Sequence, residues 1–135
     1  MKTLAIIKPD AVAAGNIGKI IAHLEKEGFK VREAQLVRLD QKLAESFYEV
    51  HRERPFFNSL VAFMTSGPAL PLALERDNAV AHLRQVIGAT DPAQAEPGTI
   101  RKLYAQSKEK NAIHASDSDE NAAREVAFFF ASRSR

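Results

Sequence analysis

The stretch NAIHASDSDENAAREVAFFF, residues 111–130, decides how the fold ends, because it predicts a strand followed directly by a helix. NAIH is a short apolar segment typical of a buried strand. In the residues behind it, apolar side chains recur at spacings of three and four, the period of a helix packed on a core. The residues expected on its buried face are Ala122, Val126, and Phe129 or Phe130. One histidine, His114, lies at the junction of the two elements.

His114 ends the predicted strand one step before the helix N-terminus, where Ser116 with Asp119 resembles a capping box. Backbone N–H groups at such a terminus point outward and favour anions. An isolated histidine is often structural. Two roles therefore stay open for His114: a structural histidine, or a residue that acts on an anionic ligand.

The rest of the chain predicts three more strands and several helices. Strands are expected at 3–8 (TLAIIK), 29–39 (FKVREAQLVRL) and 69–75 (ALPLALE), and helices from residue 17, over 41–53 and 55–65, and behind Asp77 as a cap. The strand over 29–39 is expected to bulge near Ala34-Gln35. Pro71 indicates an edge position or a bulge, and Pro55 fits a first helical turn.

The periodicity fails from Gly88 to Asn111, over GATDPAQAEPGTIRKLYAQSKEKN. Such a long connection is uncommon in a small domain and is usually functional, although a variable surface loop is the alternative.

With the additional helices set aside, the element order is βαββαβ. We therefore predict an α+β, ferredoxin-like fold: an antiparallel four-stranded sheet with helices on one face, additional helices, and a long loop before the last strand. The length of 135 residues fits one domain, residues 1–135.

The composition excludes several classes of protein. There is no cysteine, which excludes disulfides and thiolate metal sites and fits the reducing cytoplasm, where we expect the protein. The formal net charge of +2 argues against nucleic-acid binding by bulk electrostatics. The apolar run in MKTLAIIKPDAV is too short for a signal-peptide core or a membrane span.

Glu125 lies near the apolar face of the last predicted helix, so its carboxylate needs a partner. That partner is either the imidazole of His114 or a surface cation, Arg124 or Lys110. A neutral imidazole oriented by a carboxylate keeps one free lone pair and attacks without a separate base. Under the first alternative, His114 is a nucleophile for an anionic electrophile.

Cations near the long loop suit such an electrophile. Arg84, Thr90, Arg101 and Lys8 together supply two guanidiniums, a hydroxyl and an ammonium for phosphate oxygens. The sequence has no P-loop motif, and the spacing of its histidines does not fit a shared zinc site.

Four motifs, in order, carry a resemblance to a known family: IIKPDAV, RPFFNSLVAFMTSGP, GATDPAQAEPGTIR and NAIHASDS. With them, the chain resembles nucleoside diphosphate kinases along nearly its whole length. The resemblance implies a ping-pong reaction, in which a nucleoside triphosphate phosphorylates a histidine that then phosphorylates a different nucleoside diphosphate.

The resemblance also implies a role for individual residues. Those matching the catalytic group are His114 as the phosphorylated histidine, Glu125 and Ser116 as its support, Lys8 at the γ-phosphate and sugar, and Tyr48 near the transferred group. Those matching the nucleotide-binding group are Lys8, Asn111 at the sugar, Arg84 and Thr90 at the β-phosphate, Arg101 at the terminal phosphates, and Phe56 stacked on the base. His51 is a further candidate near the phosphates.

The resemblance implies Mg²⁺ carried on the nucleotide phosphates, with no metal ligand from the protein. It implies broad base acceptance and a homo-oligomer, a tetramer or hexamer built from dimers. Pro92 and the long loop match a segment used in that packing. The chain departs from the family by ending with FFFASRSR and by having Ala115 where glycine often follows the histidine. We expect alanine to be tolerated there.

Two other readings are open. A catalytically inactive relative that binds nucleotide or acts as a scaffold would need a broken site, yet His114, Lys8, Arg84, Arg101 and Asn111 are all present. An RNA-binding module would stack bases on aromatic residues of its strands, but Phe29 is the only aromatic residue in the candidate strands. We expect no obligatory nucleic-acid or membrane partner.

Overall fold

The computed structural model describes residues 1–131. The elements along the chain are β1 (Lys2–Ile7), α1 (Pro9–Ala13), α2 (Ile17–Lys26), β2 (Lys30–Ala34), α3 (Gln41–Phe47), η1 (Glu49–His51), α4 (Phe57–Met64), β3 (Leu70–Glu75), α5 (Ala79–Ile87), η2 (Pro92–Gln94), α6 (Ile100–Tyr104), β4 (Ile113–Ala115) and α7 (Asp119–Phe130). The last four residues of FFFASRSR lie outside the described residues.

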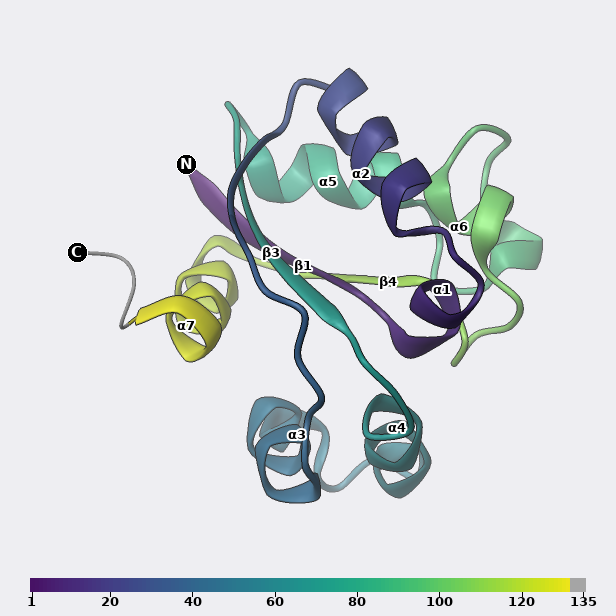
Figure 1. The fold of residues 1–135 in the computed structure, drawn as a ribbon, viewed down its shortest axis with the longest axis vertical. Coiled ribbons are helices and arrows are strands. Elements are labelled where there is room, and N and C mark those ends of the chain that lie inside the picture. The colour runs from purple at the N-terminus through teal and green to yellow at the C-terminus, as the bar shows by residue number, and fades with distance from the viewer. Residues whose placement is uncertain (132–135) are drawn as a thin grey trace.

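The four strands form one antiparallel sheet in the order β2-β3-β1-β4. The predicted α+β, ferredoxin-like plan is confirmed. Helices α2 and α5 cover one face of the sheet, and the additional helices α3, α4 and α7 cover the other (Figure 1).

Strand β1 lies in the middle of this arrangement. Its side chains alternate between the two cores: Ala5 and Ile7 face α2 and α5, while Leu4 and Ile6 face α3, α4 and α7. All four are fully buried, so the strand reads as a continuous apolar run without polar alternation.

Pro71 is not in an edge strand, because β3 lies between β2 and β1. It pairs with Ile6 on one side, and on the other its carbonyl accepts from the N–H of Gln35, just past the end of β2. Because proline has no N–H, Pro71 cannot donate a hydrogen bond toward β2. This donor is missing at a point where the pairing with β2 is already irregular. The register shift of β2 itself lies between Val31 and Glu33, earlier than the bulge predicted at Ala34-Gln35.

The residues predicted to begin three of the helices were wrong. Asn78, in the left-handed conformation, precedes α5 where Asp77 was expected. Ser118 caps α7 by accepting from the N–H of Asn121, so Ser116 and Asp119 form no capping box. The chain is still in the sheet ladder at Ser116, whose N–H donates to the carbonyl of Leu4. Pro55 lies in a turn before α4 and not in its first turn.

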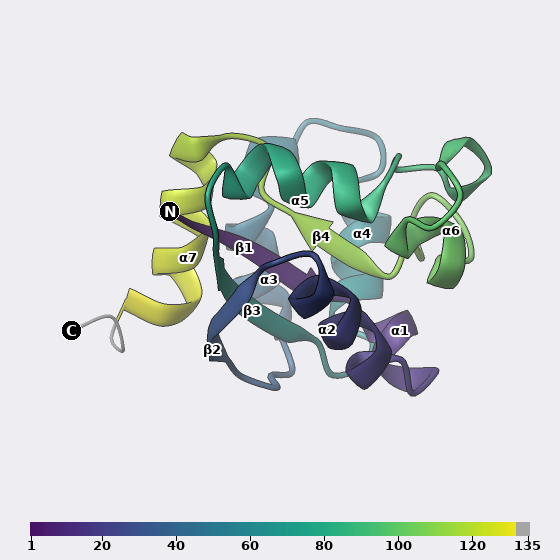
Figure 2. The ribbon, with the colours of Figure 1, turned by 90° about the horizontal axis from the view of Figure 1, so that it is seen from above.

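The segment from Gly88 to Asn111 is a long connection, but it contains η2 and α6. Ile100 anchors helix α6, because its side chain is fully buried in the core that also contains the apolar residues of α5. Figure 2 shows α6 and α1 beyond the same end of the sheet, where β1 ends and β4 begins. The start of α1 and the connection from Gly88 to Asn111 meet at this end of the sheet. Both carry predicted site residues: Lys8 in the first segment, and Thr90, Arg101 and Asn111 in the second.

Candidate active site

A cleft of about 520 Å³ is lined by Lys8 at the end of β1 and by residues of the long connection, β4, the α3–α4 region and helices α5 and α7. Its lining includes most of the predicted site residues: Lys8, Tyr48, Phe56, Arg84, Thr90, Arg101, Asn111, His114 and Glu125. Ser116 is fully buried and contacts Glu125 instead. His51 also lines the cleft. The fold thus gathers residues that are far apart in the sequence.

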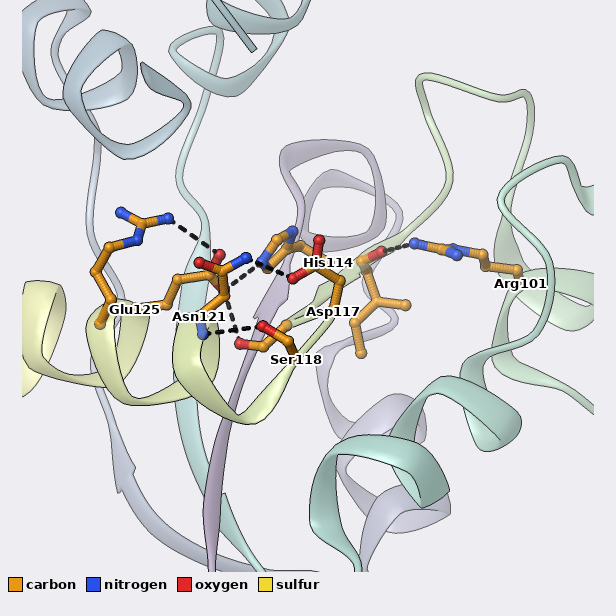
Figure 3. Close-up of polar contacts among 9 residues, drawn as sticks. Arg101, His114, Asp117, Ser118, Asn121 and Glu125 are labelled. Carbon is orange, nitrogen blue, oxygen red and sulfur yellow. Dashed lines mark hydrogen bonds and ion pairs between the residues drawn. The ribbon is translucent and has the colours of Figure 1, made fainter. Parts of the chain in front are cut away.

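His114 lies in the middle of β4, opposite Ile6, and not at the strand's end as predicted. Its Nε2 is 2.8 Å from Oε1 of Glu125, and the same oxygen accepts from the Ser116 hydroxyl at 2.7 Å. Arg124 reaches the other carboxylate oxygen at 3.4 Å (Figure 3). Of the two alternatives for Glu125, the imidazole is the shorter contact. Because Nε2 faces a carboxylate, it carries the proton, and the lone pair is on Nδ1.

The charge states of this pair follow from its surroundings. Burial lowers the pKa of His114 and outweighs the opposing effect of Glu125, so the imidazole is neutral near pH 7. Burial raises the pKa of Glu125, but the hydrogen bond and charge of His114 and the Ser116 hydroxyl outweigh it, and the pKa is lowered. A neutral imidazole held by an ionised carboxylate is the protonation state that a nitrogen nucleophile needs.

Two aromatic rings fix the plane of the imidazole. Phe47 meets it edge-on with ring centroids 5.4 Å apart, and Tyr48 does so at 6.2 Å. Burial raises the pKa of Tyr48, so its phenol stays protonated. Within residues 1–131 its hydroxyl is buried without a hydrogen-bond partner, although Tyr48 lines the cleft. The hydroxyl is a donor left available beside the histidine.

Two buried cations, Lys8 and Arg101, also line the cleft and form its cationic wall. The Lys8 ammonium donates to Oδ1 of Asn111 at 2.8 Å. The Arg101 guanidinium donates to the carbonyl of Gly88 at 3.1 Å. It also donates to the carbonyl of Ile113, one residue before His114, at 2.8 Å, and Figure 3 shows Arg101 pointing toward this part of β4. Burial, and next the charge of Arg101, lower the pKa of Lys8 to about 8. Burial, and next the charge of Arg84, lower the pKa of Arg101 to about 10.

Neither cation forms a salt bridge with a carboxylate among the described residues. Desolvated positive charges that lower one another's pKa create a local field that favours an anion. Arg84 and Thr90 extend this cationic wall as exposed residues at the cleft. The overall charge is close to neutral, so the attraction for anions at this wall comes from its own cations and not from the charge of the whole chain.

The cleft lining also contains apolar side chains, namely Val50, Phe56 and Leu60. Phe56 has 46 % of its surface exposed. The ring of His51 lies 5.4 Å from that of Phe56. An exposed aromatic ring in the lining of a cleft that also contains buried cations is suited to a ligand with a flat ring and an anionic tail.

The sequence prediction missed several polar residues of the cleft. Lys108, Glu109, Asp117 and Asn121 also line it. Asn121 donates to the carboxylate of Asp117 at 2.6 Å, and this bond lowers the pKa of Asp117 (Figure 3). The acidic run SDSDEN was the available signal, but it reads equally well as the start of a helix.

Ala115 lies within β4, paired with Ala5. Among the described residues, the non-glycine positions with positive φ are Asn78 and Ala112, so Ala115 carries no left-handed strain. The expectation that alanine is tolerated next to the histidine is consistent with this geometry.

The described residues contain no cluster of three or more imidazole or carboxylate groups suited to a metal ion. No helix in that part of the chain combines the length and apolarity needed to cross a membrane.

Comparisons with known proteins agree with this geometry. The family model described as nucleoside diphosphate kinase matches residues 1–134. A nucleoside diphosphate kinase from a Nitratiruptor species is 56 % identical over 132 residues, covering 98 % of this chain and 96 % of that protein. The one from Chlorobium limicola is 57 % identical over 129 residues, covering 96 % and 92 %.

Solved structures give the same result. The Aquifex aeolicus nucleoside diphosphate kinase superposes with a TM-score of 0.94 at 45 % identity, covering 96 % of this chain and 94 % of that one. The Halobacterium salinarum nucleoside diphosphate kinase in complex with CDP superposes with a TM-score of 0.92 at 41 % identity, covering 96 % and 87 %.

Proposed function

We propose that His114 carries the phosphoryl group in this chain, which belongs to the nucleoside diphosphate kinase family. The protein is a phosphotransferase that moves the γ-phosphate of a nucleoside triphosphate onto a nucleoside diphosphate by a ping-pong mechanism. The observation that carries the assignment is the 2.8 Å contact between Nε2 of His114 and Glu125, which leaves Nδ1 as the free nitrogen.

In the first half-reaction, Nδ1 attacks the γ-phosphorus of the donor. An N–P bond forms as the bond from phosphorus to the β,γ-bridging oxygen breaks, and the nucleoside diphosphate leaves. The ring then carries both phosphorus and the Nε2 proton and is positively charged. Glu125 stabilises that charge, and Ser116 holds the carboxylate in place at 2.7 Å. In the second half-reaction, a terminal oxygen of the acceptor diphosphate attacks the phosphorus, and a P–O bond forms as the N–P bond breaks. The electron pair returns to Nδ1, which restores neutral His114.

The cationic wall supplies what phosphoryl transfer needs most, which is positioning and charge neutralisation. We assign Arg101 to the terminal phosphates, since its buried guanidinium is tied to the carbonyl beside His114. Arg84 and Thr90 are assigned to the β-phosphate. The Tyr48 hydroxyl, which is buried without a partner among the described residues, is a donor for the transferred group.

Lys8 and Asn111 form the sugar end of the site. Their contact of 2.8 Å places an ammonium and an amide side by side, which suits a γ-phosphate together with a ribose or deoxyribose hydroxyl. Phe56 stacks on the base. Because every base has a π face, stacking alone accepts purines and pyrimidines alike.

Kinases of this family work with a divalent metal ion, and we propose Mg²⁺. The cleft lining fits an ion that arrives on the nucleotide. The cationic wall would bind the phosphates, and the described carboxylates do not form a cluster that could hold a metal ion by itself. When bound, the ion supplies charge neutralisation at the phosphates. The chain's own contribution is to hold those phosphates by Lys8, Arg84 and Arg101.

We further propose that residues 1–135 form a single domain that assembles into a tetramer or hexamer built from dimers in the cytoplasm. The family model covers residues 1–134, which supports one domain. Strand β2 lies at the edge of the sheet, so its outer backbone groups are open to pairing with a second copy. Light scattering on the purified protein distinguishes the two assemblies by mass.

The experiment that tests the assignment is covalent labelling. The protein is incubated with γ-labelled ATP and Mg²⁺, and the label is tested for lability in acid and stability in base, the signature of a phosphohistidine. His114→Ala abolishes this label, whereas the matched variant His23→Ala, a half-buried histidine of α2, retains it. Label that survives His114→Ala overturns the assignment, and a fold intact by circular dichroism makes its loss interpretable.

A further inference from the structure

The turn between Asn111 and β4 is strained. Ala112 has a φ of +75°, a conformation that side chains other than glycine rarely adopt. The N–H of Ile113 donates to the carbonyl of Asn111 at 2.9 Å, which closes a three-residue γ-turn with Ala112 at its centre. A turn of this kind persists only where its surroundings hold it.

Two groups from the start of α1 hold this turn. The N–H of Lys8 donates to the carbonyl of Ala112 at 2.9 Å. The N–H of Ala112 donates to Oδ2 of Asp10 at 3.1 Å. Ala112 is fully buried, so without Asp10 its N–H would lie in the interior without this acceptor.

Asp10 is poorly satisfied for a carboxylate in this place. Its other oxygen, Oδ1, is buried without a hydrogen-bond partner among residues 1–131. Burial also raises the pKa of Asp10, so the position opposes the charged form. Asp10 as a whole is half-buried, and a carboxylate oxygen left without a partner there is costly. The side-chain hydrogen bond that Asp10 makes among the described residues is the one to the strained turn.

We propose that Asp10 is a positioning residue: by holding the γ-turn at Ala112, it sets the Asn111 amide against the Lys8 ammonium. The proposal deepens the proposed function and rests on it, because it takes Lys8 and Asn111 as the groups that bind the nucleotide. Asn111 precedes the turn directly, and its amide nitrogen is anchored to the carbonyl of Lys108 at 2.9 Å. The carbonyl of Asn111 accepts the bond that closes the turn, so release of the turn is expected to shift the Asn111 backbone relative to Lys8.

The position of His114 does not depend on the turn at Ala112. The β4 ladder pairs Ile7 with Ile113, Ile6 with His114 and Ala5 with Ala115, and Glu125 and Arg101 hold this strand from outside the turn. Loss of Asp10 is therefore expected to weaken handling of the nucleotide while leaving the reactivity of the imidazole in place. This separation distinguishes a positioning role from general destabilisation.

The test compares two phosphoryl donors on folded variants. ATP with Mg²⁺ requires the Lys8–Asn111 pair, whereas phosphoramidate, which has neither sugar nor base, reports the reactivity of His114 itself. For Asp10→Ala we expect kcat/KM with ATP to fall about tenfold, the scale of one buried donor left unpaired, and the rate with phosphoramidate to change less than about threefold. Asp10→Asn, which keeps an acceptor oxygen but not the charge, stays within about threefold of the wild type with both donors.

Two further variants complete the design. Asp10→Ser, whose hydroxyl is too short to reach the turn, replaces Asp10→Ala if that variant does not fold. Adding Ala112→Gly to either one recovers part of the lost rate, since glycine adopts positive φ without strain.

Equal losses with both donors, an Asp10→Asn variant as slow as Asp10→Ala, or no loss at all each overturn the positioning role. A wild-type protein that neither donor labels at His114 refutes the proposed function instead.

Discussion

Nε2 of His114 lies 2.8 Å from Oε1 of Glu125, in a place where burial keeps the imidazole neutral while the carboxylate stays ionised. Phosphorylation at Nδ1 would turn that neutral ring into a cation. The carboxylate therefore interacts more strongly with the phosphorylated state, and with the transition state leading to it, than with the resting enzyme.

Glu125→Gln tests this difference. The glutamine oxygen still accepts from Nε2 but carries no charge, so we expect phosphorylation of His114 to slow about 10- to 100-fold, the scale for loss of a group that orients a functional imidazole. Rapid-quench measurement of a single turnover gives the rate. Glu120→Gln, an exposed change on the same helix, is the matched control and stays at the wild-type rate. Equal rates for the two variants would show that the charge of Glu125 is not used.

Arg101→Ala removes a buried guanidinium tied to the main chain on both sides of the site. We expect phosphoryl transfer to slow by roughly one to three orders of magnitude, the scale for a lost contact to transition-state charge. The carbonyls of Gly88 and Ile113 also lose their donor, so melting is measured in parallel and rates are compared well below the midpoint. Arg38→Ala, at an exposed arginine, controls for loss of positive charge alone. An unchanged rate would place Arg101 outside the phosphate site.

The pKa of Lys8, lowered to about 8 by burial and the charge of Arg101, predicts a pH limit. The ammonium binds phosphate only when protonated, so kcat/KM for the nucleotide is full below pH 8 and falls as the pH rises through about 8. Between about 8 and the ordinary value of 10.5, the unfolded chain binds this proton and the folded chain does not. Stability from this group therefore rises with pH in that window, and its titration does not cause unfolding.

The pH profile of kcat/KM is the measurement, with Lys8→Met as the control. In that variant kcat/KM is already low below pH 8, and its pH profile lacks the descending limb near pH 8. A descending limb that persists without Lys8 assigns the titration to another group.

Phe56→Ala tests base recognition. With 46 % of its surface exposed, the ring contributes little to the core, so the fold is expected to be unaffected. Stacking on an aromatic side chain contributes about 1–3 kcal/mol per base, so we expect KM to rise roughly 5- to 150-fold. The increase is similar for adenine, guanine, cytosine and uracil nucleotides. Leu103→Ala, at another exposed apolar residue, leaves KM unchanged. A loss confined to one base would mean that hydrogen bonds, and not stacking, read it.

The sequence allowed the four-stranded antiparallel plan to be predicted, because local patterns marked the strands and the helices between them. Apolar runs mark β1 and β3 because burial on both faces removes polar alternation. The roles that the four motifs imply for Lys8, Arg101 and His114 stay predictions, and the structure places the three residues at one cleft. The helices α1 and α6 were missed because each is five residues long, too short for a helical period to be visible.

The caps failed for a different reason. Ser116, Ser118 and Asp119 are all acceptable cap residues, and only the length of the β4 ladder decides that the helix begins after Ser118. The strained turn at Ala112 and its bond to Asp10 could not be predicted either. That bond joins residues 102 positions apart, and no local pattern reports such a contact.

Ala115→Gly tests whether the residue after the histidine needs the freedom of glycine. Ala115 is 7 % exposed in β4 and lies outside the positive-φ positions of the described chain. We therefore expect transfer within about twofold of the wild type and an unfolding free energy lower by about 0.5–1 kcal/mol, as for glycine inside a strand. Ala112→Gly, at a φ of +75°, is the matched control, with unfolding free energy unchanged or raised because strain is relieved. Urea denaturation with a coupled transfer assay measures both quantities. A faster or more stable Ala115→Gly variant would show that the backbone is strained beside the histidine.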